Sequence, residues 1–227
     1  MSDPQTAATG LKEESKDWQE AYRDPQLIAR RTRKHRQRLG TLGVFSWPRD
    51  SSVLDLACGT GEALRILHGE GFTKLSGVDV TIDQDLKREP WLEVKAGDGR
   101  SLPYANETFD AVICMHSLHH LGGLEGIRST LKEAARILKP GGRLALIDHY
   151  DAWQVRFAFW GVSQWWLTWP TSGLRSFHKQ HIDEWPYMMD YLNNWPNVRA
   201  TIDGLGFEKP DVDTKCWVFF YWSARKK

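Results

Sequence analysis

The sequence has no apolar run long enough to cross a membrane and no excess of charge of one sign. A membrane-spanning helix needs roughly 18 to 20 consecutive apolar residues, and no stretch approaches that length. Lys and Arg number 30 and Asp and Glu 29, which gives a formal net charge of +1, so nothing global attracts nucleic acid. The N-terminus also lacks the basic and apolar regions of a secretory signal. We therefore expect a cytoplasmic protein, either free or peripheral at a membrane surface.

Cysteine is scarce, whereas tryptophan is abundant. Cys58, Cys114 and Cys216 are isolated from one another and from paired histidines, which argues against a disulfide framework and against a zinc site. We expect reduced core cysteines and no bound metal. Of the 12 tryptophans, seven lie close together at Trp153, Trp160, Trp165, Trp166, Trp169, Trp185 and Trp195.

The chain divides into a short tail and one domain. Residues 1–15 are polar and lack periodicity, so we expect them to be disordered. Residues 16–227 form the domain, with a helical cap at 16–48 and a tryptophan-rich insertion at 152–195. The cap contains a basic run at 30–38, for which three interpretations stay open: a solvated helix face, a contact with anionic lipid, or a contact with RNA phosphates.

Beyond Pro48, short apolar runs alternate with amphipathic segments. The apolar pattern predicts strands at 52–57, 74–80, 92–96, 109–115 and 143–150 and helices at 62–69 and 124–138. Strands joined by helices form parallel sheets covered on both faces. A helix is predicted near 198–205, followed by strands at 207–212 and 216–222. Because the connection at 213–215 is too short for a crossover helix, the last two strands must form an antiparallel hairpin.

The first predicted strand runs through Asp55 into a turn that contains Gly59 and Gly61 and then directly into a helix. Glycines there let a ligand approach bare backbone, and the helix N-terminus offers free N–H groups. A dinucleotide fingerprint would place a small residue at Leu64, so NAD and FAD are disfavoured. A carboxylate at Asp55 would repel a pyrophosphate but attract the ammonium and sulfonium of S-adenosylmethionine.

Two further acids follow later strands. Asp79 lies 18 residues after Gly61, close to the spacing at which an acid binds ribose hydroxyls in such folds. Asp98 follows the third predicted strand, where its carboxylate can accept the adenine amino group. We expect these two carboxylates and that of Asp55 to face one cleft.

Four motifs together resemble the class I S-adenosylmethionine-dependent methyltransferases, in particular the small-molecule group that includes the ubiquinone and menaquinone C-methyltransferases. They are VLDLACGTG, GVDV, AGDGRSLPYANETFDAVICMHSLHHL and LKPGGRLALID, all within about residues 50–150. The resemblance implies a Rossmann-like α/β fold with a seven-stranded sheet of order 3-2-1-4-5-7-6, in which the last strand is antiparallel. The positions that it assigns to the cofactor are Asp55, Ala57, Gly59, Gly61, Asp79, Val80, Asp98, Gly99, Met115 and His116. Ala57 departs from the family, which usually has glycine there.

The sequence indicates the residues that bind the methyl acceptor less clearly than those that bind the cofactor. Methyl transfer to a phenol, a hydroxyl or an activated carbon is helped by a general base, for which histidine is the obvious candidate. We assign the base to His149, which ends the fifth predicted strand, with Tyr150 and His181 as alternatives. The insertion around 152–169 is apolar nearly all round, so we expect it to cover the domain as a lid or to line a site for a large apolar acceptor.

The sequence therefore predicts a methyltransferase acting on a small hydrophobic or aromatic acceptor, with O-, C- and N-methylation all open. Two alternatives remain: a phospholipid headgroup N-methyltransferase and a non-catalytic S-adenosylmethionine-binding domain. We expect a small-molecule partner and peripheral membrane contact, and we do not expect a nucleic acid partner.

Overall fold

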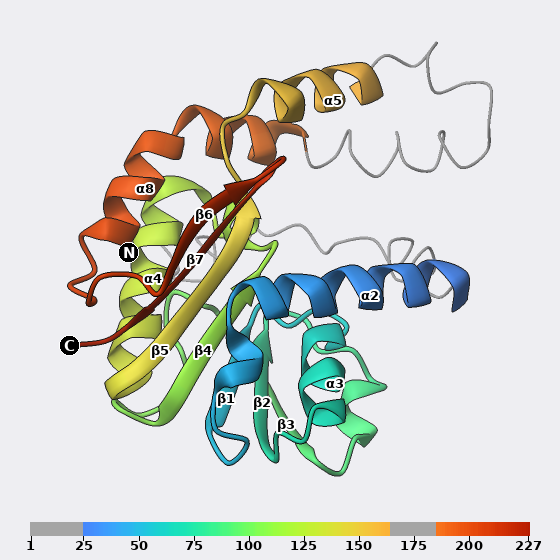
Figure 1. Ribbon diagram of the computed structural model, residues 1–227, viewed down its shortest axis with the longest axis vertical. Coiled ribbons are helices and arrows are strands. Elements are labelled where there is room, and N and C mark those ends of the chain that lie inside the picture. Colours follow the sequence, from blue (N-terminus) through green and yellow to red (C-terminus); the bar gives the residue numbers. More distant parts are fainter. Residues whose placement is uncertain (1–24, 164–184) are drawn as a thin grey trace, which may run out of the picture.

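The computed structural model describes residues 25–163 and 185–227 of the chain. Within them, one seven-stranded sheet has the order β3-β2-β1-β4-β5-β7-β6 (Figure 1), which confirms the expected topology. The strands are β1 (Ser52–Leu56), β2 (Lys74–Asp79), β3 (Leu92–Ala96), β4 (Phe109–Met115), β5 (Leu138–His149), β6 (Val212–Cys216) and β7 (Phe219–Arg225). The principal helices are α2 (Pro25–Thr41), α3 (Glu62–Gly69), α4 (Gly123–Ile137), α5 (Trp153–Ser163) and α8 (Trp195–Asp203).

Strands β1 to β5 are parallel to one another, and β7 is antiparallel to both of the strands that flank it. β1 pairs in parallel with both β2 and β4, while β7 is antiparallel to β5 and to β6. The chain therefore leaves β1 toward β2 on one side and reaches β4 on the other. In open α/β sheets, a ligand binds outside the carboxyl ends of the strands at such a switch point.

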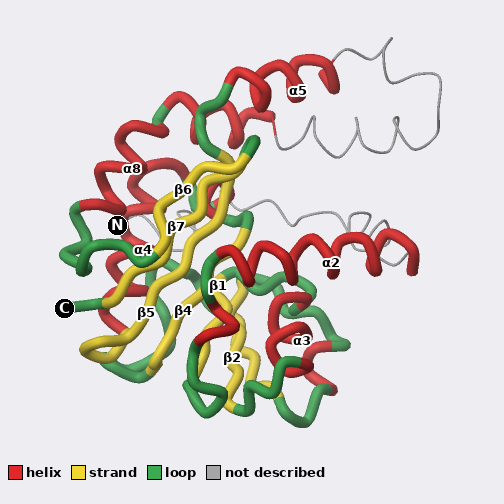
Figure 2. The backbone as a smooth tube through the Cα atoms, in the orientation of Figure 1, coloured by secondary structure: helices red, strands yellow, loops and turns green. Residues whose placement is uncertain are grey.

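Alternate residues of the central strands supply two separate hydrophobic cores. Figure 2 shows the helices that cover them, with α4 and α8 on one side of the strands and α2 and α3 on the other. Leu54, Val112 and Leu144 pack with apolar residues of α4 and α8 on one face. Val53 and Ile113 pack with residues of α2 and α3 on the other. This alternation explains why these strands are apolar nearly throughout, as expected of strands covered on both sides.

The C-terminal hairpin exists, but the predicted position of its turn is wrong. The expected turn at 213–215 lies inside β6, and the chain reverses at Trp217 and Val218 instead. Phe207, predicted to begin a strand, forms only an isolated bridge with Lys226. β6 is an edge strand whose residues are mostly exposed, so it has no apolar pattern that would mark its position.

Two smaller expectations also need correction. Cys58 and Cys114 are buried free thiols as expected, but Cys216 is exposed on β6. β5, predicted at 143–150, begins five residues earlier at Leu138 and ends at His149. No helix in the described portions of the chain has the length and apolar character needed to span a bilayer.

Candidate active site

The turn after β1 follows a left-handed backbone path. The φ angles of Ala57, Gly59 and Gly61 are 59°, 50° and 71°. A side chain costs roughly 1–2 kcal/mol in this conformation, which explains why glycine suits position 57 and shows that Ala57 is accommodated with strain. A Cβ atom at Gly61 would come within 2.2 Å of a Leu86 methyl group, whereas one at Gly59 would meet no atom within 4 Å. Close packing against Leu86 therefore requires glycine at position 61, whereas the backbone at Gly59 is open to a ligand.

Asp79 fastens this turn to the end of β2. Its Oδ2 accepts a hydrogen bond from the Gly59 amide at 2.8 Å, and its Oδ1 accepts one from the Thr81 amide at 3.1 Å. Burial raises the pKa of Asp79, and these amides partly oppose that effect. Each oxygen keeps a further lone pair, so the carboxylate can still accept hydrogen bonds from a ligand. Val80, the next residue, is 55% exposed and offers an apolar surface beside it.

Asp55 lies within β1, as the predicted strand at 52–57 has it, and it is buried. Burial and the neighbouring charge of Asp79 raise its pKa to about 8. The two carboxyl groups thus come together as expected, but Asp55 is largely protonated at neutral pH. A cation bound beside the pair would favour the ionised form of both.

Asp98 does not share this arrangement. Arg100 donates hydrogen bonds to both of its carboxylate oxygens at 2.6–3.0 Å and lowers its pKa. A Cβ atom on Gly99 would come within 2.9 Å of the Thr130 side chain of α4, so this glycine permits close packing. The adenine role assigned to these two residues stays a prediction.

The end of β4 places His116 beside the glycine turn and α2. Met115 is buried, and His116 has a φ of 56°. The His116 ring stacks on His35 of α2 with 5.7 Å between centroids. Its Nε2 is buried and finds no hydrogen-bond partner among residues 25–163 and 185–227, and burial lowers the pKa of His116 well below the usual value. A strained residue with an unsatisfied buried nitrogen is typical of a ligand site.

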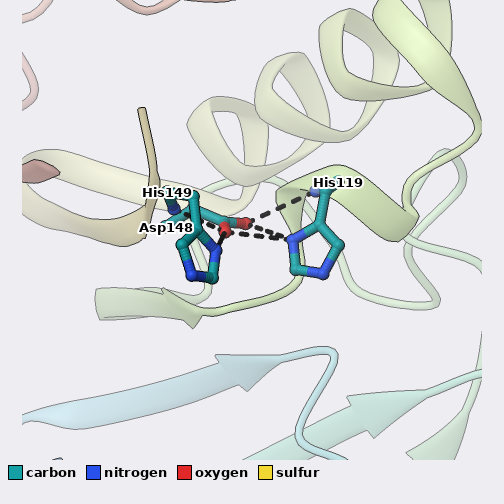
Figure 3. A group of neighbouring side chains, drawn as sticks. All are labelled: His119, Asp148 and His149. Carbon is teal, nitrogen blue, oxygen red and sulfur yellow. Dashed lines mark hydrogen bonds and ion pairs between the residues drawn. The ribbon is translucent and has the colours of Figure 1, made fainter. Parts of the chain in front are cut away.

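Asp148 binds two histidines at the end of β5 (Figure 3). Its fully buried carboxylate accepts hydrogen bonds from the amides of Leu118 at 2.8 Å and His149 at 2.7 Å. The Nδ1 atoms of His119 and His149 lie 3.0 and 3.3 Å from its Oδ1. Burial alone would raise the pKa of Asp148, but the charge and hydrogen bonds of the two histidines hold it well below the usual value.

This geometry orients His149. With Nδ1 directed to Asp148, the opposite ring nitrogen, Nε2, is the atom left for an acceptor. The ring lies 4.6 Å from that of Phe219 and 6.3 Å from that of Phe159, measured between centroids. The assigned base therefore stands among aromatic side chains and is held by a buried carboxylate.

The other two candidate bases are placed differently. Tyr150 donates its hydroxyl hydrogen to the Trp217 carbonyl at 3.0 Å, and Lys215 lies over its ring, so the hydroxyl is engaged by the β6–β7 turn. His181 lies outside the described residues. Sequence reasoning missed Asp148 as a functional residue. The feature that could have indicated it is an acid near the end of an otherwise apolar strand.

The sheet order is the one expected of the class I S-adenosylmethionine-dependent methyltransferase fold, and the glycine turn and the Asp55 and Asp79 pair lie at its switch point. A family model described as a methyltransferase domain matches residues 54–146. That segment runs from within β1 to within β5 and contains Asp55, Asp79 and His116, but it ends before Asp148 and His149.

Individual relatives agree with this assignment. The chain is 34% identical over 103 residues to a demethylmenaquinone methyltransferase of Streptomyces griseus, covering 42% of this chain and 41% of that one. It is 28% identical over 175 residues to a 2-phytyl-1,4-naphtoquinone methyltransferase of Thermosynechococcus vestitus, covering 71% and 74%. The fold also matches a 1,6-didemethyltoxoflavin-N1-methyltransferase of Burkholderia thailandensis solved with S-adenosylhomocysteine, with a TM-score of 0.59, 15% identity and coverage of 100% and 91%. The chain thus spans about two-fifths of the first relative's length and about three-quarters of the second's.

Proposed function

We propose that this protein transfers a methyl group from S-adenosylmethionine to a small apolar acceptor. The observation that carries the proposal is the turn at the carboxyl ends of β1 and β2, where the open backbone of Gly59 donates a hydrogen bond to Asp79 and the Asp79 carboxylate lies near enough to raise the pKa of Asp55. Two of the relatives named above are methyltransferases of a menaquinone precursor and of a naphthoquinone, which supports the general chemistry and an aromatic acceptor.

The residues present fit this cofactor. Gly59 leaves room for a ligand against the backbone, and Asp79 has lone pairs for two ribose hydroxyls. Asp55 can stabilise positive charge by ionising, and the buried Nε2 of His116 can accept a hydrogen bond from an ammonium group. S-adenosylmethionine supplies an electrophilic methyl group on a sulfonium when it is bound.

On the acceptor side, we assign His149 as the general base. An acceptor hydroxyl would give its proton to Nε2 while the oxygen forms a bond to the methyl carbon, and the electron pair of the broken carbon–sulfur bond stays on sulfur. Asp148 stabilises the imidazolium that forms, because its carboxylate lies against Nδ1. This geometry favours a hydroxyl or carbon acceptor, since a neutral amine needs no base. Phe159 and Phe219 add apolar walls suited to an aromatic ring.

The experiment that tests cofactor binding is calorimetry with S-adenosylmethionine on the full chain. Asp79→Asn should weaken binding about tenfold or more, because it removes a charged acceptor of hydrogen bonds. Asp85→Asn is the matched control, since Asp85 is exposed and lies only six residues further on. Failure of the wild-type protein to bind, or equal affinity in Asp79→Asn, would refute the proposal.

The acceptor role of His149 is tested by transfer of a labelled methyl group to a panel of phenols, quinols, amines and lipids. His149→Gln should lower turnover by about 10² or more while leaving S-adenosylmethionine affinity unchanged. His120→Gln is the control, because His120 stacks on His119 but is not seen to hydrogen-bond Asp148 among the described residues. Equal turnover in His149→Gln and wild type would remove His149 from the mechanism.

A further inference from the structure

Helix α5, beside the site, has apolar residues on its buried face and also on its exposed face. Ala152, just before α5, and Val155 and Phe159 on the helix are buried against the domain. On α5, Trp153, Phe157 and Trp160 are 72%, 62% and 49% exposed. Their spacing of four and three residues places them on one helix face, and the rings of Phe157 and Trp160 are 5.6 Å apart. Contiguous exposed aromatics of this kind mark an interaction surface.

A fourth aromatic belongs to the same edge of the molecule. Trp217 is 77% exposed and sits in the β6–β7 turn with a φ of 56°. Its carbonyl accepts the hydrogen bond from Tyr150, which ties this turn to the start of α5. A bulky residue in the left-handed region is unusual, and a strained position that presents tryptophan to solvent indicates a functional requirement. We name Trp153, Phe157, Trp160 and Trp217 the aromatic surface.

Exposed basic residues of α2 lie at the same end of the sheet as the aromatic surface. Arg30, Arg33 and Lys34 are exposed on α2, and α2 reaches the end of β4 through the stacking of His35 on His116. α2 reaches the carboxyl edge of the sheet through His35 and α5 begins where β5 ends, so both helices lie at that edge. In Figure 1 the N-terminal end of α2 and the C-terminal end of α5 project toward the same side of the molecule. Arg31 and Arg36 are paired with Glu62 and Glu70.

We propose that the aromatic surface docks on an anionic lipid bilayer, with the basic residues of α2 facing the headgroups. Tryptophan and phenylalanine favour the membrane interface, and a basic cluster adds attraction for anionic lipid. The surface borders the acceptor side, because Phe159 on the buried face of α5 contacts the His149 ring. The docking proposal rests on the proposed function at one point: an apolar acceptor would enter the site from the bilayer.

The test is co-sedimentation of the full chain with vesicles of phosphatidylcholine alone or mixed with phosphatidylglycerol. We expect the wild-type protein to bind the mixed vesicles. The double variant Trp153→Ser/Phe157→Ser should lose about tenfold or more in partitioning. Arg30→Glu/Arg33→Glu should lose a similar factor, and only on the mixed vesicles.

The matched control is Lys132→Glu/Lys209→Glu, which makes the same change in net charge at exposed residues of α4 and of the segment after α8. It should bind as the wild type does. Absence of wild-type binding, wild-type behaviour of the aromatic variant, or equal loss in the control would overturn the proposal. Self-association through the same surface without vesicle binding would also overturn it. Vesicle binding requires no turnover, so failure of methyl transfer and failure of docking are distinguishable.

Discussion

Among single residues, Asp55 couples the proposed cofactor site to the stability of the protein. Its pKa is raised from 3.8 to about 8 by burial and by Asp79, so the folded state keeps a proton that the unfolded state releases above about pH 4. Stability from this group is therefore greatest at low pH and falls by about 1.4 kcal/mol per pH unit up to about pH 8. Asp55→Asn should remove this slope, so that the variant gains stability relative to the wild type as the pH rises. Urea unfolding of both proteins at several pH values measures the difference.

Because other groups also titrate, the informative quantity is the difference between the two proteins at each pH. Two stability curves that stay parallel between about pH 5 and about pH 8 would show that Asp55 is ionised in the folded state. A gap that widens with pH would show that the carboxyl is held neutral until a cation arrives.

Residue patterns predicted the acids of the proposed cofactor site better than they predicted the hydrogen-bond partners of the acids. Asp55 and Asp79 come together because parallel strands end at one edge, which follows from the alternation of strands and helices. Asp98 is instead bound by Arg100, a local contact that no periodic pattern shows. Asp148 was missed because a single acid in an apolar strand does not reveal that two histidines from different segments converge on it.

At the level of elements, the accuracy of the sequence prediction follows burial. The predicted ends of β1 to β4 agree with the structure within about one residue, since each of these strands coincides with a distinct run or amphipathic pattern. β6 was misplaced because it is an exposed edge strand, and its turn at Trp217 and Val218 lacks the Gly, Asn or Asp that usually marks a hairpin. Residues 1–15 and most of the insertion after Ser163 lie outside the described residues, so the expected tail and lid stay predictions.

At the level of the whole molecule, α2 fastens the N-terminal region to both halves of the site. Arg31 and Thr32 donate hydrogen bonds to Glu62, the first residue of α3, and the His35 ring also contacts it. The Arg38 guanidinium lies over the Phe219 ring at 4.3 Å, so the same helix reaches β7. No sequence pattern indicates these contacts, because about thirty residues separate α2 from Glu62 and none of the three interpretations of the basic run paired it with α3.

Glu62→Gln should therefore loosen α2 from the domain. Burial raises the pKa of Glu62, but hydrogen bonds from His35, Thr32 and Arg31 outweigh this effect and lower it to about 2. The stabilisation is thus present above the ordinary pKa of 4.5 and is lost as the pH falls toward about 2. We expect a loss of about 2 kcal/mol near neutral pH and faster hydrogen exchange in α2. Glu125→Gln, which breaks the exposed pair with Arg128, should cost less than about 0.5 kcal/mol, and equal exchange of α2 in wild type and Glu62→Gln would contradict this role.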